Sequence, residues 1–497
     1  MRRVVRFWLG DELREVAAVA PTTTLLDWLR GVEGRTGTKE GCNEGDCGAC
    51  TVLLTRLRDG RVVHEPVCAC IRLLATVDGC RVATVEDLAR DGELHPVQRA
   101  MVEQHASQCG FCTPGIVTSL WALRLDRPEP PEEAEIEARL AGNLCRCTGY
   151  GPIVRAARAM YEFEPAPAAD PLLAAAELWR ARLAERDTGE PLLLEGPDGA
   201  RLIAPARLEE LSDLLAARPD ALLLAGGTDV GLRITKDLDR PPLILWLGRV
   251  AELQRIEEGL EELRIGAAVT WREAAAALRR LAPGLGELVA RFAGEQIRAT
   301  ATVVGNLANA SPVGDGPPAF LALDARLVLR HGDRRRELPL ADFYRAYRRT
   351  ALEPGEFVEA VRIPHPPPGS RVIFEPGSRV IFEKVSKRRE QDIATVSAGI
   401  ALAVEDGRVR HVRLAFGGMA AIPARARAAE AALEGAAWDE AAIDRATVAL
   451  ARDFAPISDH RGSAAYRRTV AANLLRRLWL ESRGVPVRLH AAEPALG

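Results

Sequence analysis

The chain has 497 residues, of which 47% are hydrophobic and 27% are charged, and its formal net charge is −3. This length predicts three or four domains, each able to bury a core. The small net charge provides no basic field for nucleic acid, and no apolar run is long enough to span a membrane. The apolar start at Val4 stops at Gly10, too early for a secretion signal, so we expect a cytoplasmic protein with reduced cysteines.

Residues 1–84 are predicted to form a small β-rich domain. The runs 3–9 and 13–19 are expected to pair as a hairpin, because Gly and Asp between them favour a tight turn. A short helix capped near Thr24 and a strand starting at Thr51 follow.

A loop of this domain contains Cys42, Cys47 and Cys50 in the spacing C-x4-C-x2-C. This is the plant-type ferredoxin spacing, which holds a [2Fe-2S] cluster. Four thiolates also suit zinc, but structural zinc sites usually combine two C-x2-C pairs, and only one is present here. The spacing leaves both Cys68 and Cys70 available as the fourth ligand.

Residues 85–162 change to helical signals. Pro114, Pro131 and Gly151 each indicate the start of a helix, with Thr113 as the N-cap of the first. This pattern predicts a small helical domain.

A second group of cysteines lies at the ends of these helices: Cys109, Cys112, Cys145 and Cys147. The positive end of a helix dipole near Cys112 would favour an anionic thiolate site. The spacing is less familiar than that of the first group, so zinc competes more strongly with iron–sulfur here.

The second half of the chain is expected to be mixed α/β. A linker at 163–195 precedes a domain at 196–366 and a final domain at 380–487. Between the last two, the octapeptide 368–375 is repeated identically as 376–383. We interpret the repeat as a recent duplication, or an error in the sequence, that lengthens a loop.

A glycine loop spans Leu223 to Gly231 after an apolar strand. Such loops present backbone N–H groups that can cradle a pyrophosphate, although a tight strand-to-helix turn explains the glycines equally well. A second loop at 302–306, with Asp315 nearby, could line the same cofactor. The basic run 384–389 is either a solvated face or a charge partner for a flavin or nicotinamide phosphate.

Together these motifs resemble the xanthine oxidase family of molybdenum hydroxylases. The likeness covers nearly the whole chain and rests on its cysteine and flavin motifs. The cysteine motifs are residues 42–52, 69–71, 84–86, 108–115 and 142–150.

The resemblance implies a multi-domain α+β fold. Its parts would be a β-grasp ferredoxin-like domain (1–84), a helical-bundle iron–sulfur domain (85–162), a linker (163–195), an α/β FAD-binding domain of the vanillyl-alcohol-oxidase type (196–366) and a C-terminal α+β domain like that of CO dehydrogenase flavoproteins (380–487).

The resemblance also assigns ligands, selecting Cys70 over Cys68. The implied ligands of the two [2Fe-2S] clusters are Cys42, Cys47, Cys50 and Cys70 for the first, and Cys109, Cys112, Cys145 and Cys147 for the second. The implied FAD residues are Leu223, Leu224, Ala225, Gly226, Gly227, Thr228, Asp229, Val230, Phe292, Thr302, Gly305, Asn306, Asp315, Val358 and Lys384. No catalytic residue is assigned to this chain.

In such a family member, a large partner chain would carry molybdopterin and oxidise hypoxanthine and xanthine to urate, in an assembly of two small and two large chains. This chain would pass the electrons through both clusters to FAD and on to NAD. Gln391 stands where some members have an acid near the nicotinamide, which leaves oxygen open as the acceptor. Alternatives are a related hydroxylase for aldehydes, carbon monoxide or N-heterocycles, and a zinc-stabilised scaffold with no redox role.

Overall fold

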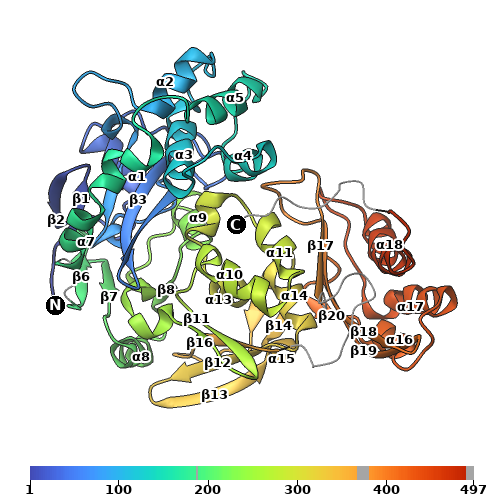
Figure 1. The fold of residues 1–497 in the computed structure, drawn as a ribbon. Coiled ribbons are helices and arrows are strands. Elements are labelled where there is room, and N and C mark those ends of the chain that lie inside the picture. Colours follow the sequence, from blue (N-terminus) through green and yellow to red (C-terminus); the bar gives the residue numbers. More distant parts are fainter. Residues whose placement is uncertain (186–188, 366–379, 488–497) are drawn as a thin grey trace.

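The computed structural model describes residues 1–185, 189–365 and 380–487. We divide it into a first region (1–84), a second region (85–185), a central region (189–365) and a C-terminal region (380–487). The first and second regions lie together at one end, and the C-terminal region lies at the opposite end of the central region (Figure 1). The expected multi-domain α+β fold is confirmed.

The first region is a five-stranded sheet of order β2-β1-β5-β3-β4 with one helix. Its elements are β1 (Val5–Leu9), β2 (Glu12–Val16), α1 (Leu25–Gly31), β3 (Thr51–Arg58), β4 (Arg61–Cys68) and β5 (Arg81–Ala83). The predicted hairpin is β1–β2, and the Thr24 side chain caps α1 by accepting a hydrogen bond from the Asp27 amide. Strands β3 and β4 place Thr51 opposite Cys68, so both cysteine segments meet at one end of the sheet.

The second region is helical. Its first four α-helices are α2 (Pro96–Glu103), α3 (Thr113–Asp126), α4 (Glu133–Leu140) and α5 (Gly151–Ala159). The N-cap of α3 is Cys112 rather than Thr113. The Thr113 hydroxyl hydrogen-bonds to Ser107 at 2.7 Å, so Thr113 enters the first helical turn instead of capping it.

The first part of the segment expected as a linker folds onto the helices of the second region, and Trp179 further along it packs against Trp8 of the first region. The segment contains η3 (Pro167–Ala169), α6 (Pro171–Ala174) and α7 (Ala176–Ala184). Asp170 is buried; one carboxylate oxygen caps α6 and the other lies 2.9 Å from Nε2 of His95. The Arg124 guanidinium also reaches Asp170, at 3.4 Å. A buried acid with such partners holds the segment in place.

The central region contains two sheets. The smaller, of order β6-β7-β9-β8, consists of β6 (Leu192–Glu195), β7 (Arg201–Ala204), β8 (Leu222–Leu224) and β9 (Leu243–Trp246). The larger, of order β10-β11-β16-β12-β13, consists of β10 (Ile256–Glu258), β11 (Glu262–Gly266), β12 (Arg326–His331), β13 (Arg334–Pro339) and β16 (Phe357–Pro364). The short strands β14 (Tyr344–Ala346) and β15 (Arg349–Thr350) pair with each other.

Helices lie around and between these two sheets. They are α8 (Leu208–Ala217), α9 (Val230–Thr235), α10 (Trp271–Leu281), α11 (Leu285–Arg291), α12 (Glu295–Arg298), α13 (Val303–Ala308), α14 (Gly316–Ala322) and α15 (Leu340–Phe343). Trp271, at the start of α10, is fully buried and stacks on Phe292 with ring centroids 4.5 Å apart.

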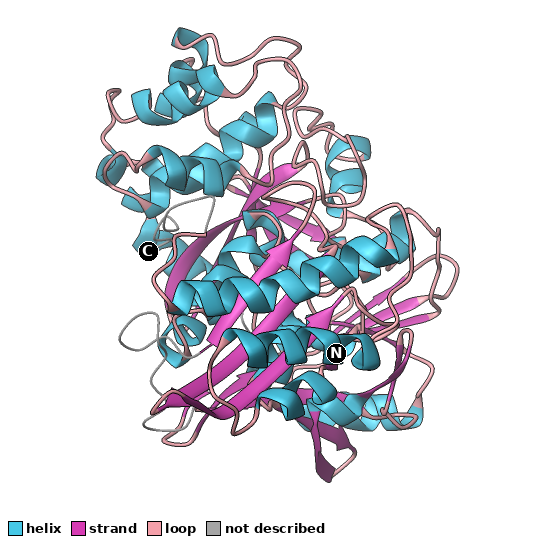
Figure 2. Cartoon of the chain, turned by 90° about the vertical axis from the view of Figure 1, so that its right-hand side faces the viewer, coloured by secondary structure: helices cyan, strands magenta, loops and turns pink. Residues whose placement is uncertain are grey.

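The C-terminal region packs helices on one antiparallel sheet. Its elements are β17 (Val380–Val385), β18 (Val396–Glu405), β19 (Arg408–Gly417), β20 (Ala424–Arg425), α16 (Arg427–Leu433), α17 (Glu440–Asp453) and α18 (Ala464–Ser482). Viewed from this end, helices lie in front of long strands (Figure 2). Most of the repeated octapeptide lies outside the described residues; only 380–383, its last four residues, are described, in β17.

The hydrophobic cores show how the regions join. The first region shares one core with the smaller central sheet: Phe7, Leu29 and Val67 belong to the same buried cluster as Leu192 and Ile244. The second region has a core of its own around α3 and α5, to which only a few first-region side chains contribute. Among the described helices, none combines the length and apolar character needed to cross a bilayer.

Candidate functional site

The first cysteine group forms a compact site at the end of the β3–β4 hairpin. Three backbone amides, those of Glu44, Asp46 and Cys47, point at the Cys42 sulfur from 3.3–3.4 Å. Side-chain hydrogen bonds from Cys47 and Cys70, followed by backbone hydrogen bonds from Cys47 and Glu44, hold the pKa of the Cys42 thiol far below its ordinary value. A loop that aims N–H groups at one sulfur favours its thiolate form.

Two further members of this group, Cys50 and Cys70, are buried close to one another, whereas Cys47 is half-buried. Cys50 and Cys70 are 2% and 1% exposed, and their side chains interact with each other. Cys68 also approaches Cys50, and its sulfur lies 3.7 Å from the Gly45 carbonyl. The structure therefore gathers the four predicted ligands and places the open alternative, Cys68, beside them.

One glycine of the loop is required by close packing. Gly48 has φ of +68°, and a Cβ atom there would lie 2.1 Å from the Gly142 carbonyl oxygen. Only glycine combines that backbone conformation with that approach. The loop of the first group is thus seated directly against the segment that leads to Cys145.

The second cysteine group lies at the surface. Cys109 and Cys147 are exposed, whereas Cys112 and Cys145 are half-buried. The side chains interact in the pairs Cys109–Cys147 and Cys112–Cys145, so the two sequence motifs meet in space. The Cys145 amide donates to the Tyr150 hydroxyl at 2.8 Å, which holds the turn between α4 and α5.

The pKa values of the two half-buried thiols, Cys112 and Cys145, shift in opposite directions. Burial, followed by contact with Cys145, raises the pKa of Cys112 to about 12. For Cys145, burial acts in the same direction, but hydrogen bonds led by Thr148 outweigh it and lower the pKa. Among the described His, Cys, Asp and Glu residues, no group of three or more is arranged around a single metal ion.

A cavity of about 280 Å³ lies in the central region between the glycine loop, α13 and β16. Most of the predicted FAD residues line it: Leu223, Ala225, Gly226, Gly227, Thr228, Asp229, Val230, Phe292, Thr302, Gly305, Asn306 and Val358. Leu224 does not; it is 1% exposed and belongs to the core shared with the first region, because alternate side chains of β8 face opposite sides.

Sequence reasoning missed several wall residues. Leu247, Ala301 and Phe357 are apolar and carried no distinguishing pattern. Asn309 could have been found, because it follows Asn306 by three residues and so lies on the same face of α13. Its side chain hydrogen-bonds to Asp229 across the cavity.

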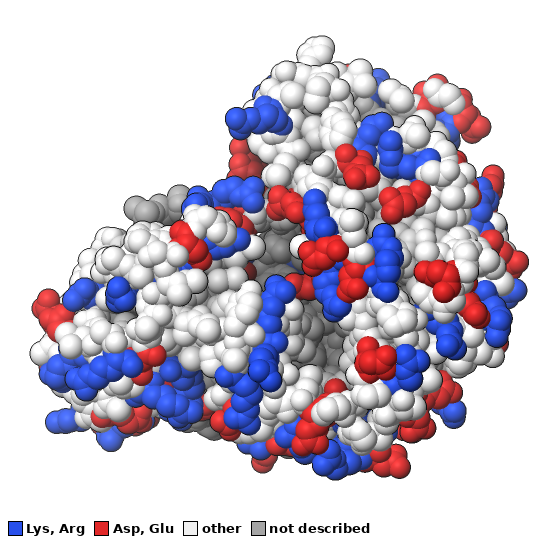
Figure 3. Space-filling view, turned by 180° about the vertical axis from the view of Figure 1, so that it is seen from behind, with Lys and Arg blue, Asp and Glu red and all other residues white. Residues whose placement is uncertain are grey.

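A second cavity of about 530 Å³ shares Thr228, Asp229, Phe292 and Asn306 with the first. Asp315 and Lys384, the remaining predicted FAD residues, line this second cavity. From behind, the surface is hollowed between the N-terminal and C-terminal parts of the molecule, with side chains of both charges around the hollow (Figure 3).

Lys384 and Asp315 form a buried ion pair in the wall of this cavity. The Lys384 ammonium donates to the Asp315 carboxylate at 2.6 Å and to the Arg291 carbonyl at 3.0 Å. Burial raises the pKa of Asp315, although Lys384 opposes the rise. The second carboxylate oxygen of Asp315 is buried without a hydrogen-bond partner among the described residues, so it is free to accept one from a bound group.

The loop of the first cysteine group forms another wall of this second cavity. Glu44, Gly45 and Asp46 line it, and the Gln391 side-chain amide donates to the Asp46 carbonyl at 3.3 Å. Gly231, at the start of α9, packs on the residue after Cys70: a Cβ there would lie 2.7 Å from Cβ of Ile71. The first cysteine site and the central cavities are therefore direct neighbours.

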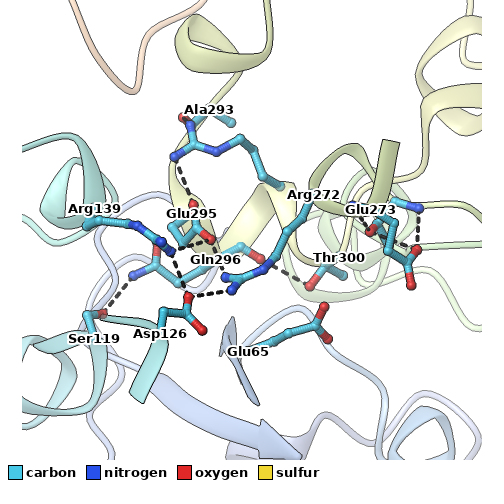
Figure 4. Close-up of polar contacts among 12 residues, drawn as sticks. Glu65, Ser119, Asp126, Arg139, Arg272, Glu273, Ala293, Glu295, Gln296 and Thr300 are labelled. Atoms are coloured by element: carbon cyan, nitrogen blue, oxygen red, sulfur yellow. Dashed lines mark hydrogen bonds and ion pairs between the residues drawn. The ribbon is translucent and has the colours of Figure 1, made fainter. Parts of the chain in front are cut away.

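The second cysteine site is joined to the central region by polar contacts. Glu295 forms ion pairs with Arg139 of α4 and with Arg272 of α10, and Asp126 of α3 pairs with the same two arginines (Figure 4). Next to them, the side chain of Gln296 points towards Ser119 of α3 (Figure 4).

Four family models match successive parts of the chain. They are "2Fe-2S iron-sulfur cluster binding domain" (residues 9–73), "[2Fe-2S] binding domain" (84–158), "FAD binding domain in molybdopterin dehydrogenase" (198–366) and "CO dehydrogenase flavoprotein C-terminal domain" (382–482).

Two solved structures share the fold of more than half of the chain. A reconstituted CO dehydrogenase from Oligotropha carboxidovorans is 30% identical, with a TM-score of 0.52, over 56% of this chain and 96% of that chain. Quinoline 2-oxidoreductase from Pseudomonas putida 86 is 28% identical, with a TM-score of 0.51, over 57% and 96%. The chain belongs to the xanthine oxidase family of molybdenum hydroxylases.

Among curated relatives of this family member, the xanthine dehydrogenase of Emericella nidulans is 33% identical over 96% of this chain. The xanthine dehydrogenase/oxidase of Rattus norvegicus is 32% identical over 93% of this chain. The chain spans 38% of the length of each. It contains two [2Fe-2S]-binding domains and an FAD-binding domain, and its role is electron transfer within an oxidoreductase of this family.

Proposed function

We propose that this chain is the iron–sulfur and FAD subunit of a xanthine dehydrogenase. It would receive electrons from a large partner chain that carries molybdopterin and oxidises hypoxanthine and xanthine to urate, and would deliver them to NAD. Its similarity to xanthine dehydrogenases along nearly its whole length supports this assignment.

The position of the two cysteine groups carries the proposal. Cys109 and Cys147 are exposed, so the second site can meet a partner chain. The loop of the first site, at Gly45 and Asp46, lines a cavity continuous with the predicted FAD residues. Electrons would therefore enter at the second group, cross to the first and leave through the central cavities.

The residues present fit the proposed cofactors. Each cysteine group offers four thiols, linked by pairwise side-chain interactions, and we propose Cys70 rather than Cys68 as the fourth ligand of the first group. The glycine loop from Leu223 to Val230 would hold the FAD pyrophosphate, and the free Asp315 oxygen would accept a hydrogen bond from the cofactor. When bound, the clusters carry single electrons, and the flavin exchanges these for a hydride.

The second cavity supports NAD as the acceptor. Arg388 and Arg461 line it and can face an anionic dinucleotide, although each also lies near a carboxylate, that of Asp46 at 3.9 Å and that of Asp392 at 4.0 Å. We further propose domain limits at residues 84, 162, 195 and 366, and an assembly of two small and two large chains.

The test uses the full chain reconstituted with iron, sulfide and FAD. We expect about four irons per chain, one FAD, NADH oxidation with an artificial dye, and xanthine oxidation only after the partner chain is added. A colourless chain that binds zinc in place of iron would show the zinc-stabilised scaffold instead. Xanthine turnover by this chain alone would overturn the division of labour.

The similarity to quinoline 2-oxidoreductase favours a second candidate, a hydroxylase of N-heterocycles. The substrate site would then lie on a partner chain of different specificity, and the electron-transfer role of this chain would be unchanged. Substrate profiling of the co-purified complex distinguishes the two.

A further inference from the structure

The two cysteine groups are linked by one backbone hydrogen bond. The Leu144 amide donates to the Cys47 carbonyl at 2.9 Å. Cys47 belongs to the first group, and Leu144 directly precedes Cys145 of the second. The path from one predicted ligand to the other is thus covalent except for this single contact.

Buried side chains stabilise this hydrogen bond between Leu144 and Cys47. Asn143, which is 3% exposed, donates from its side-chain amide to the Gly48 carbonyl at 3.1 Å and to the Thr51 hydroxyl at 3.3 Å. Its own side-chain oxygen accepts from Ser119 at 2.7 Å. Asn143 therefore ties the segment before Cys145 to the loop that contains Cys47.

A glutamine from the central region completes the arrangement. Gln296 is 1% exposed, and its side-chain amide donates to Asn143 at 2.8 Å, to Ser119 at 3.1 Å and to Thr51 at 3.2 Å. These four side chains come from three regions and meet at one buried point. The side chains that form these hydrogen bonds are all neutral, so the node acts through its geometry.

Resting on the proposed function, we propose that the Leu144–Cys47 hydrogen bond is the electronic bridge between the two clusters, and that Asn143 and Gln296 are positioning residues that hold it. Electron tunnelling weakens steeply at each non-covalent gap, so a short hydrogen bond is a better route than a van der Waals contact. The step moves one electron from one cluster to the other and breaks no bond.

The experiment uses the full chain loaded with both clusters and FAD. Light reduces the bound flavin, with EDTA as the electron donor, and rapid freezing with electron paramagnetic resonance follows the arrival of electrons at each cluster. The same method measures the magnetic splitting between the two fully reduced clusters, which reports their coupling independently of turnover.

In Ser119→Ala and Asn143→Ala we expect arrival at the second cluster to slow several-fold and the splitting to decrease. Arrival at the first cluster, iron content and FAD content should not change. Thr118→Val is the matched control, because Thr118 is the neighbouring buried hydroxyl of α3 but bonds only to the Pro114 carbonyl. If Asn143→Ala fails to fold, Gln296→Met removes the central amide at similar volume.

The proposed bridge would be overturned if variants that retain both clusters show the wild-type magnetic splitting and the wild-type rate of electron arrival at the second cluster. An equal slowing at both clusters, or the same effect in Thr118→Val, would also overturn it, because that outcome reflects general loosening. Failure of electrons to reach either cluster in the wild-type chain would contradict the proposed function instead.

Discussion

The two cysteine regions are attached to the central region by different forces. The first shares a continuous hydrophobic core with the smaller central sheet. The second meets it through the buried carboxylate of Glu295, its half-buried partners Arg139 and Arg272, and the polar node at Gln296. Hydrophobic contact does not depend on the protonation of any side chain, whereas a buried ion pair depends on the charge of each partner.

This difference matches the exposure of the two sites. Cys50 and Cys70 are enclosed beside the cavities, while Cys109 and Cys147 face outwards. A site enclosed by a shared core keeps a constant distance to its neighbour. The second region is held by the ion pairs of Glu295 with Arg139 and Arg272, which we call the polar seam. Its cysteine site lies at the surface, where it can contact another chain. The predictions below test this contrast.

The largest effect is expected from removing one ligand of each site. Cys50→Ser and Cys147→Ser should each lower the iron content from about four to about two per chain. Cys50→Ser should also lower the melting temperature, because Cys50 lies in the shared core, whereas Cys147→Ser should leave both melting and FAD binding nearly unchanged. Iron assay, flavin absorbance and thermal unfolding measure the three quantities. Loss of FAD in Cys147→Ser would contradict the proposal that the second cysteine site is structurally independent of the FAD site.

The polar seam should fail when its central acid is removed. Glu295→Ala leaves Arg139, Arg272 and Arg298 without their shared carboxylate, so we expect a loss of about 3–5 kcal/mol of unfolding free energy. Glu258→Ala, which breaks the exposed pair with Arg280, should lower the unfolding free energy far less. Urea unfolding compares the two. Equal losses of unfolding free energy in the two variants would contradict the expected larger contribution of Glu295.

Acid should weaken the same seam. Burial disfavours the ionised form of Glu295, yet Arg272, Arg298 and Arg139 outweigh it and lower its pKa to about 2, against an ordinary value of 4.5. Its stabilisation is therefore complete above pH 4.5 and is lost as the pH falls from 4.5 towards 2. The stability difference between wild type and Glu295→Gln should shrink over this window. A stability difference that does not change with pH would contradict the lowered pKa of Glu295.

The smallest effect on the isolated chain is expected from Phe111→Ser. Phe111 is 47% exposed between Cys109 and Cys112, so its removal should change stability by about 0.5 kcal/mol or less. If the second site faces the partner chain, the variant should bind that chain more weakly, as measured by analytical ultracentrifugation. Tyr347→Ser, at a 59% exposed position of the central region, is the control.

Local patterns were sufficient for several individual elements. The turn at Gly10, the cap at Thr24 and the glycine of α5 act within a few residues, and each element formed as predicted. Thr113 shows the limit of local reasoning, because a contact with Ser107 changed its role. The segment around Asp170 shows a larger limit, because a proline-rich composition does not reveal partners 46 and 75 residues away.

The sequence by itself determined which chemistry the chain can hold, because cysteine spacing and glycine loops act over short distances along the backbone. Only the tertiary structure decided how the sites communicate. Asp315 meets Lys384 across 69 residues, Gln296 meets Asn143 across 153, and Gln391 meets Asp46 across 345. Such pairs are set by the packing of whole regions, which no local pattern encodes.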